Sequence, residues 1–191
     1  AVLRGYDRER DAARERLEQL KRSKPAIGYS HPEWLWRRWE KEWGSERVIR
    51  LLEWNNSPPP VFARVNTLKT SAVELLKIWR EEVVASEPVK LDWVSEQTVF
   101  RLESYPSLAK LRSFAEGLFY VQDPSTLLAP ALLGALSGES ILDLCAAPGG
   151  KTTYIAQLIK NDGRVVARDI DPGGLKMGHE NAKGIGGTCV Y

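Results

Sequence analysis

The spacing of apolar residues predicts that the first part of the chain is helical. Apolar positions at helical intervals predict a charged helix over residues 3–23, a second helix that ends at Gly44, and a short third helix over residues 45–54. The proline run in residues 55–60 (NNSPPP) then breaks the pattern, because consecutive prolines cannot continue a helix.

Two features of the second predicted helix concern its start and its buried face. Ser30 and Glu33 stand at capping-box spacing with Pro32 between them, which predicts that Ser30 caps this helix and that Pro32 lies in its first turn. The stripe of Trp36, Trp39 and Trp43 repeats at helical spacing, and such a stripe more often belongs to a core than to a surface that stacks on bases.

After the proline run, the pattern becomes that of a small α+β domain. Ser71 and Glu74 form a second capping-box pair at the start of a predicted helix over residues 71–82. The other predicted elements are strands at 61–66, 89–94, 97–102 and 118–122, with a tight turn at 95–96 and a short helix at 107–114. The resulting order, β-α-β-β-α-β, predicts a split-βαβ domain, a fold class that includes RNA-recognition modules.

From residue 123 the chain changes again, to strands that alternate with helices. The predicted elements are a helix over 125–136 capped by Asp123–Pro124, strands at 141–144 and 164–170, helices at 151–160 and 172–183, and the start of a strand at 188–191. Strands that alternate with helices predict a parallel, doubly wound sheet. The fold class is therefore α/β: N-terminal helices, a small RRM-like domain, and the first part of a Rossmann-like domain.

Composition limits the protein class more than it indicates a function. The 191 residues are 43% hydrophobic and 27% charged, which is ordinary for a soluble globular protein, and the net charge is only +2. We expect neither a signal peptide nor a membrane span, and two cysteines fit a reduced, cytoplasmic setting without a metal site. The first residue is Ala1, which we interpret as an internal position of a longer protein, although removal of an initiator Met would also leave Ala1.

The sequence ILDLCAAPGGKT, residues 141–152, places a buried strand before a glycine-rich turn and a helix. This arrangement is typical of nucleotide-class ligand sites, although it also occurs as ordinary packing. A P-loop would need a glycine where Cys145 stands, and a dinucleotide fingerprint would need more glycines than Gly149 and Gly150. The D-x-G-x-G-x-G pattern of S-adenosylmethionine (SAM) sites fits better, with Asp143 as its acid and Cys145 and Ala147 in place of two glycines.

A SAM site also needs an acidic residue at the end of the next strand, where it can accept hydrogen bonds from the ribose hydroxyls. Asp169 stands at that position, and Asp171 is the neighbouring candidate. Spacing alone leaves open that Asp169 is a simple helix cap. We expect Cys145 to be a small loop residue rather than a nucleophile, and Cys189 to be a buried strand residue.

The segment DLCAAPGGKT closely resembles the SAM loop of the Nol/Nop/Sun family of RNA 5-methylcytosine methyltransferases. PPPVFARVNTLK (residues 58–69) is similar to the family's entry into its small RNA-binding domain, and FYVQDPST (119–126) to its link into the catalytic domain. HPEWLWRRWEKEWG (31–44) resembles the bacterial branch, which methylates small-subunit ribosomal RNA. The resemblance implies a helical segment at 1–56 that begins with the end of a NusB-like domain, a small RNA-binding domain at 57–122, and a truncated SAM-binding domain at 123–191.

The resemblance also implies the site and its partners. SAM is the implied cofactor, and its implied binding residues are Cys145, Ala146, Ala147, Pro148, Gly149, Gly150, Lys151 and Asp169. The implied partner is RNA, with ribosomal RNA favoured over tRNA, and Arg64 and Lys69 are candidate contacts. One departure from the family is a glycine pair at positions 173–174, at the start of a predicted helix.

The catalytic residues of the family are the larger departure. The family adds a cysteine thiolate to C6 of cytosine, which turns C5 into a nucleophile for the SAM methyl group. The implied cysteines belong to Pro-Cys and Thr-Cys motifs after the third strand, and the pair Thr188–Cys189 comes too early to be one of them. We therefore expect no catalytic residue and no turnover in this chain alone. The alternative is a non-catalytic RNA-binding or assembly module with a degenerate SAM loop; a P-loop hydrolase is disfavoured by Cys145.

Overall fold

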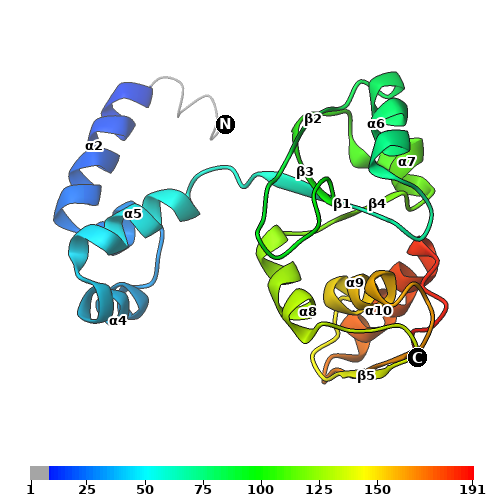
Figure 1. Cartoon of the computed structure of the whole chain (residues 1–191). Coiled ribbons are helices and arrows are strands. Elements are labelled where there is room, and N and C mark those ends of the chain that lie inside the picture. The colour runs from blue at the N-terminus through cyan, green and yellow to red at the C-terminus, as the bar shows by residue number, and fades with distance from the viewer. Residues whose placement is uncertain (1–8) are drawn as a thin grey trace. The chain divides into compact units, whose positions relative to one another are not determined.

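The structure is a computed structural model that describes residues 9–191. The chain divides into two compact units, and the boundary between them falls between Pro59 and Pro60, within the predicted proline break. In Figure 1 the first unit runs from blue to cyan and the second from cyan through green to red. Among the described residues, no helix is long and apolar enough to cross a membrane.

The first unit is built from helices around a small core. Its elements are α2 (Arg10–Ser23), α3 (Pro25–Gly28), α4 (Glu33–Trp43) and α5 (Ser45–Asn55). The predicted helices are confirmed, except that residues 3–8 of the first lie outside the described part of the chain. The core consists of buried side chains from α3 to α5, namely Ala26, Tyr29, Trp36, Val48 and Leu52.

The predicted capping box at Ser30 is wrong. Helix α4 begins at Glu33 with Pro32 as its N-cap and without a side-chain cap. Ser30 instead has a φ of +57°, and its N–H donates to the carbonyl of Ile27. Ser30 therefore helps to end the preceding helix α3, a role that the S-x-x-E spacing does not reveal.

The tryptophan stripe lies only partly in the core. Trp36 is buried and Trp39 is half-buried, whereas Trp43 is 45% exposed and Trp34, which lies off the stripe, is 65% exposed. The prediction of a core stripe is thus confirmed for Trp36 and wrong for Trp43. The rings of Trp39 and Trp43 nevertheless stack, with centroids 5.9 Å apart.

The second unit opens with the predicted split-βαβ domain. Its elements are β1 (Val61–Val65), α6 (Ala72–Glu81), β2 (Ala85–Pro88), β3 (Val99–Ser104), η1 (Leu108–Lys110), α7 (Arg112–Ala115) and β4 (Phe119–Val121). The strands form one antiparallel sheet in the order β2-β3-β1-β4, so β3 lies between the two strands joined by α6. This is the predicted topology, and the capping box of Ser71 and Glu74 is present at the start of α6.

The predicted hairpin at residues 89–102 is only partly confirmed: β3 overlaps the predicted strand at 97–102 and pairs antiparallel with β2, but the strand predicted at 89–94 is a loop. Strand β2 ends at Pro88, β3 begins only at Val99, and the segment between them is a long loop rather than a tight turn. The alternating apolar residues of this loop, Val89, Leu91 and Val94, pack against a core around Leu127 and Tyr154. The alternation that predicted a strand therefore arises from a loop with one buried side.

Each face of the four-stranded sheet is covered by other parts of the chain. On one face, Trp79 of α6 packs edge-on against Phe100 and Phe119, with ring centroids 5.7 and 5.3 Å apart. On the other face, Phe62 and Val99 pack against the core around Leu127 and Tyr154. Figure 1 shows α6 and α7 on one side of the sheet and α9 and α10 on the other.

The rest of the second unit has the predicted α/β order. The elements are η2 (Pro124–Leu127), α8 (Leu128–Leu133), β5 (Ser140–Asp143), α9 (Gly150–Leu158), β6 (Arg164–Ala167) and α10 (Pro172–Ile185). Strands β5 and β6 are parallel, and Val190 makes an isolated parallel bridge to Val165 where the next strand was predicted. The structure confirms an α/β fold with part of a Rossmann-like domain, although the predicted helix at 125–136 and strand at 164–170 are both shorter.

The two serines predicted to cap helices give a direct stability test. Ser71→Ala removes the acceptor of the Glu74 N–H and should lower the free energy of unfolding by about 1 kcal/mol. Ser30→Ala is the matched control, because the hydroxyl of Ser30 does not cap α4 and its backbone N–H is kept in the variant; it should change the free energy of unfolding by less than about 0.5 kcal/mol. Urea unfolding followed by circular dichroism measures both; an equal loss in the two variants would contradict the assignment of the caps.

Candidate cofactor site

The predicted SAM loop connects the end of β5 at Asp143 to the start of α9 at Gly150. Two backbone hydrogen bonds fix the loop. The N–H of Ala146 donates to the carbonyl of Arg168, after β6 (3.1 Å), and the N–H of Gly149 donates to the carbonyl of Ala146 (2.6 Å). Ala146 is buried, whereas Cys145 and Pro148 are exposed. The loop therefore presents the side chains of Cys145 and Pro148 to solvent from a preformed backbone.

Asp143 ties the loop to the helix that follows it. One carboxylate oxygen accepts the N–H of Cys145 (3.1 Å), and the other accepts the hydroxyl of Thr152 (2.7 Å). The carboxylate thus joins the first residue of the loop to the first turn of α9. The sequence identified Asp143 as the acid of the loop motif but not Thr152 as its partner.

Asp169, the predicted second acid, lies against the loop itself. Its Oδ1 accepts the N–H of Asp171 (3.0 Å), and its Oδ2 accepts the N–H of Ala147 (2.9 Å). These two N–H groups, and to a smaller extent the charge of Lys151, lower the pKa of Asp169. Because a carboxylate offers about four acceptor positions, Asp169 can still accept hydrogen bonds from a ligand. Asp171, the other candidate, instead caps α10 by accepting the N–H of Gly173 (3.0 Å).

Two glycine contacts let the loop lie directly on α10. Gly149 has a φ of +102°, and a Cβ there would lie 2.9 Å from the Cα of Gly178. A Cβ on Gly174 would lie 2.8 Å from the Cβ of Ala147. The unusual glycine pair at 173–174 is explained in part, because Gly174 leaves room for the loop above α10.

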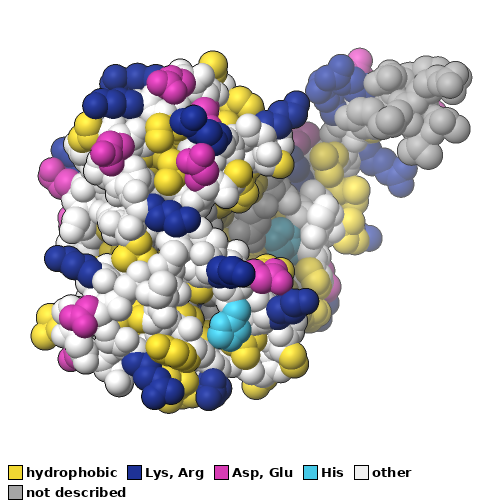
Figure 2. All heavy atoms as spheres, turned by 90° about the vertical axis from the view of Figure 1, so that its right-hand side faces the viewer, with side chains coloured by type: hydrophobic (Ala, Val, Ile, Leu, Met, Phe, Trp, Pro, Cys, Tyr) yellow, Lys and Arg dark blue, Asp and Glu magenta, His cyan; other side chains and the backbone are white. Residues whose placement is uncertain are grey.

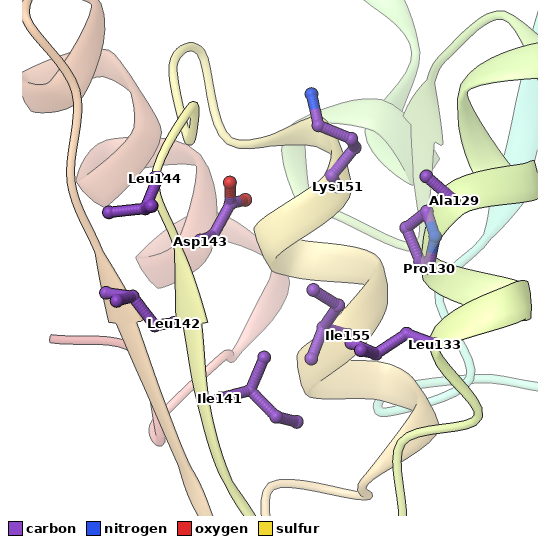
Figure 3. A pocket seen from close by; sticks show the side chains of 9 residues that line it. All are labelled: Ala129, Pro130, Leu133, Ile141, Leu142, Asp143, Leu144, Lys151 and Ile155. Atoms are coloured by element: carbon purple, nitrogen blue, oxygen red, sulfur yellow. The ribbon is translucent and has the colours of Figure 1, made fainter.

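A groove of about 250 Å³ opens beside the loop, between α8, β5 and α9. Figure 3 shows Leu133, Ile141 and Ile155 pointing toward one another within it. The carboxylate of Asp143 and the amine of Lys151 lie at the end nearest the loop. The groove is thus apolar along its length and charged at one end.

The two cysteines differ sharply in their surroundings. Cys145 is exposed in the loop, and Cys189 is 3% exposed beside β6, where burial raises the pKa of its thiol. The prediction that Cys189 is a buried strand residue is therefore confirmed for its burial but not for the strand, because Cys189 lies in a turn next to the bridge residue Val190. Within residues 9–191, no group of three or more His, Cys, Asp or Glu side chains could hold a metal ion.

The structure adds one loop contact that the sequence did not predict. The side-chain amide of Asn181 in α10 donates to the carbonyl of Pro148 (2.8 Å) and to the hydroxyl of Tyr120 in β4 (3.1 Å). A single asparagine on a predicted helix carries no signal of such a role. The loop is therefore held both by its own sheet and by residues of the small domain.

The contact between the loop and α10 predicts a specific sensitivity at Gly149. Gly149→Ala adds a Cβ that must displace Gly178, and it should destabilise the protein by about 1–3 kcal/mol beyond the cost of its positive φ. Gly138→Ala is the matched control, because Gly138 has a φ of +88° and nothing within 4 Å of an added Cβ. Urea unfolding measures the difference; equal losses would show that the loop does not pack on α10.

Two protein-family models match separate parts of the chain. The model described as 16S rRNA methyltransferase RsmB/F matches residues 130–191. The model described as the ferredoxin-like domain of RsmF/B-like methyltransferases matches residues 31–95. The match to the ferredoxin-like domain agrees with the split-βαβ topology of the sheet.

Similar proteins of known name and structure agree with these matches. The chain is 34% identical over 190 residues to a probable ribosomal RNA small subunit methyltransferase B of Bacillus subtilis. The match covers all of this chain but only 41% of that protein. The chain is 32% identical to a 28S rRNA (cytosine-C(5))-methyltransferase of Mus musculus, covering 99% of this chain and 24% of the relative.

The fold is also found in a solved structure, that of NSun6 from Pyrococcus horikoshii with SFG. The match has a TM-score of 0.73 at 20% identity and covers 84% of this chain and 64% of the other. Together, the fold, the two family models and the named relatives show that the chain belongs to the Nol/Nop/Sun family of RNA methyltransferases.

Proposed function

We propose that the chain carries the SAM loop and the RNA-recognition part of a ribosomal RNA (cytosine-C5) methyltransferase. The observation that supports this most directly is the bond from the Ala147 N–H to Asp169, because it brings the second acid to the loop. The relatives named above are rRNA methyltransferases, and one is named for cytosine C5. NSun6, which shares the fold, has been crystallised with SFG, a SAM analogue.

The proposed cofactor site consists of the loop residues 145–151 and Asp169. SAM, when bound, supplies the methyl group for transfer. Asp169 has free acceptor positions for the ribose hydroxyls, and the first N–H groups of α9, at Gly150 and Lys151, have no partner within the helix. These N–H groups and the Lys151 amine suit the carboxylate of the cofactor's methionine part. The acceptors of Asp169 thus suit the ribose of SAM, and the donors at the start of α9 suit its methionine carboxylate.

Neither cysteine of the chain fits the nucleophile that C5 methylation requires. Burial raises the pKa of Cys189, which disfavours the thiolate, and Cys145 belongs to the proposed cofactor loop. We therefore place the nucleophile outside these 191 residues and expect no methyl transfer by this chain alone. The relatives are much longer than the chain, which leaves room for further catalytic residues.

The proposed domains of the chain are a helical segment at 1–56, a small RNA-binding domain at 57–122 and part of the methyltransferase domain at 123–191. The proposed partner is RNA. Relatives with small-subunit and 28S names support ribosomal RNA over tRNA as the substrate. The cytoplasmic setting stays a prediction. Figure 2 shows Lys and Arg side chains interspersed with Asp and Glu on the face in view rather than gathered in one patch. Arg64 is removed from the candidate RNA contacts, because its side chain is buried.

The reaction is tested on the protein from which the chain derives. Methyl groups from labelled SAM should appear at C5 of a cytosine in ribosomal RNA, identified by mass spectrometry of the digested RNA. Methylation at a base nitrogen would contradict the proposal, as would measurable transfer by residues 1–191 alone.

The cofactor site is tested with two neighbouring aspartates. Asp169→Asn removes charge-assisted hydrogen bonds worth about 1.5–3 kcal/mol each, so SAM should bind about tenfold more weakly or worse. Asp171→Asn is the matched control, because asparagine caps helices as well as aspartate, and it should leave SAM affinity unchanged. Isothermal titration measures both; equal affinities in the two variants would remove Asp169 from the site.

A further inference from the structure

Arg64 of β1 is a buried cation within the second unit. Its side chain is 0% exposed, and it forms no salt bridge with any residue from 9 to 191. Burial lowers the pKa of Arg64 to about 9, so the guanidinium is still charged at neutral pH. Its Nε is buried and, among the described residues, has no hydrogen-bond partner. A well-packed apolar residue would often give equal or greater stability at such a position, so packing alone does not account for the arginine.

The hydrogen bonds of Arg64 run from the small sheet to the start of α9. Nη1 donates to the Gln122 side chain and to the carbonyl of Gly150 (2.9 Å), and Nη2 donates to the hydroxyl of Thr153 (3.0 Å). The guanidinium also lies 5.1 and 5.2 Å from the ring centroids of Tyr120 and Tyr154. Gly150 belongs to the proposed cofactor loop, so Arg64 contacts that loop from the side opposite to the exposed residues.

A second tether joins the same sheet to the same half of the loop. Asn181 bridges the hydroxyl of Tyr120 and the carbonyl of Pro148. A Cβ on Gly150 would lie 3.0 Å from Nε2 of Gln122, so the small sheet also approaches the loop at van der Waals range. The loop is thus held at its first half by Asp143 and Asp169 and at its second half by the small domain.

We propose that Arg64 is a positioning residue for the cofactor, which fixes the second half of the SAM loop and the first turn of α9 from the small domain. This inference rests on the proposed cofactor site. The planar guanidinium reaches Gln122, Gly150 and Thr153 at once, which the single ammonium of a lysine cannot do with the same geometry. Cofactor affinity should therefore depend on residues of the sheet of the small domain.

The test compares Arg64→Met and Arg64→Lys with the control Arg101→Met, which removes an exposed arginine from the neighbouring strand β3. Two readouts are taken on the 191-residue chain: SAM affinity by isothermal titration, and the rate at which iodoacetamide alkylates Cys145, identified by peptide mass spectrometry. Cys145 is exposed in the loop, and the buried Cys189 serves as an internal check of folding.

Arg64→Met should weaken SAM binding about tenfold or more and change the alkylation rate of Cys145, whereas Arg101→Met should change neither. Arg64→Lys should restore only part of the affinity. If Arg64→Met does not fold, Thr153→Val carries the test, because it removes the hydroxyl that accepts from Arg64 while keeping the side-chain shape. It should weaken SAM binding about fivefold while the melting temperature stays close to that of the control.

Two results would overturn the inference: a Cys145 alkylation rate that is the same in Arg64→Met and Arg101→Met, or affinity losses that only follow losses of thermal stability across the variants. Failure of the unmodified chain to bind SAM would instead contradict the proposed cofactor site. In that case the alkylation rates still decide whether Arg64 positions the loop, so the two failures are distinguishable.

Discussion

The buried guanidinium of Arg64 links the two halves of the second unit. It lies over the rings of Tyr120 and Tyr154, and within residues 9–191 its hydrogen-bond acceptors are all uncharged. These hydrogen bonds and ring contacts offset part of the cost of burying the cation, although its Nε has no partner among the described residues. They therefore favour one arrangement of the small sheet and the start of α9. The proposed SAM loop, which leads into α9, is therefore held from both sides.

The same packing limits how the small domain can recognise RNA. In an RNA-recognition module of this topology, the open face of the sheet stacks on bases. Here that face carries Phe62, Arg64 and Val99 and is covered by the core around Leu127 and Tyr154. Any RNA contact of this domain would therefore have to come from strand edges, loops or helices. The split-βαβ topology alone points instead to the face that is covered here.

Much of the fold follows from the sequence, because periodicity and local signals such as the Ser71 capping box and the proline break act over a few residues. Two predictions were wrong because the same residue types also serve other roles. The alternating apolar residues at 89–98 pack a loop against a core that is distant in sequence, and Ser30 follows the end of helix α3 instead of capping α4. For the candidate site, the loop motif and Asp169 were predicted, and Asp169 does lie against Ala147. Thr152, Gly178, Asn181 and the role of Arg64 were not, since each depends on which elements pack together.

We propose that the segment from Cys145 to Lys151, together with Asp169, forms a SAM site whose shape is already present in the chain. The most direct measurement is a titration of the isotope-labelled chain with SAM, followed by NMR of the backbone amides. We expect saturable shifts that are largest in residues 145–151 and at Asp169. Shifts that do not saturate, or that are largest elsewhere in the chain, would contradict it.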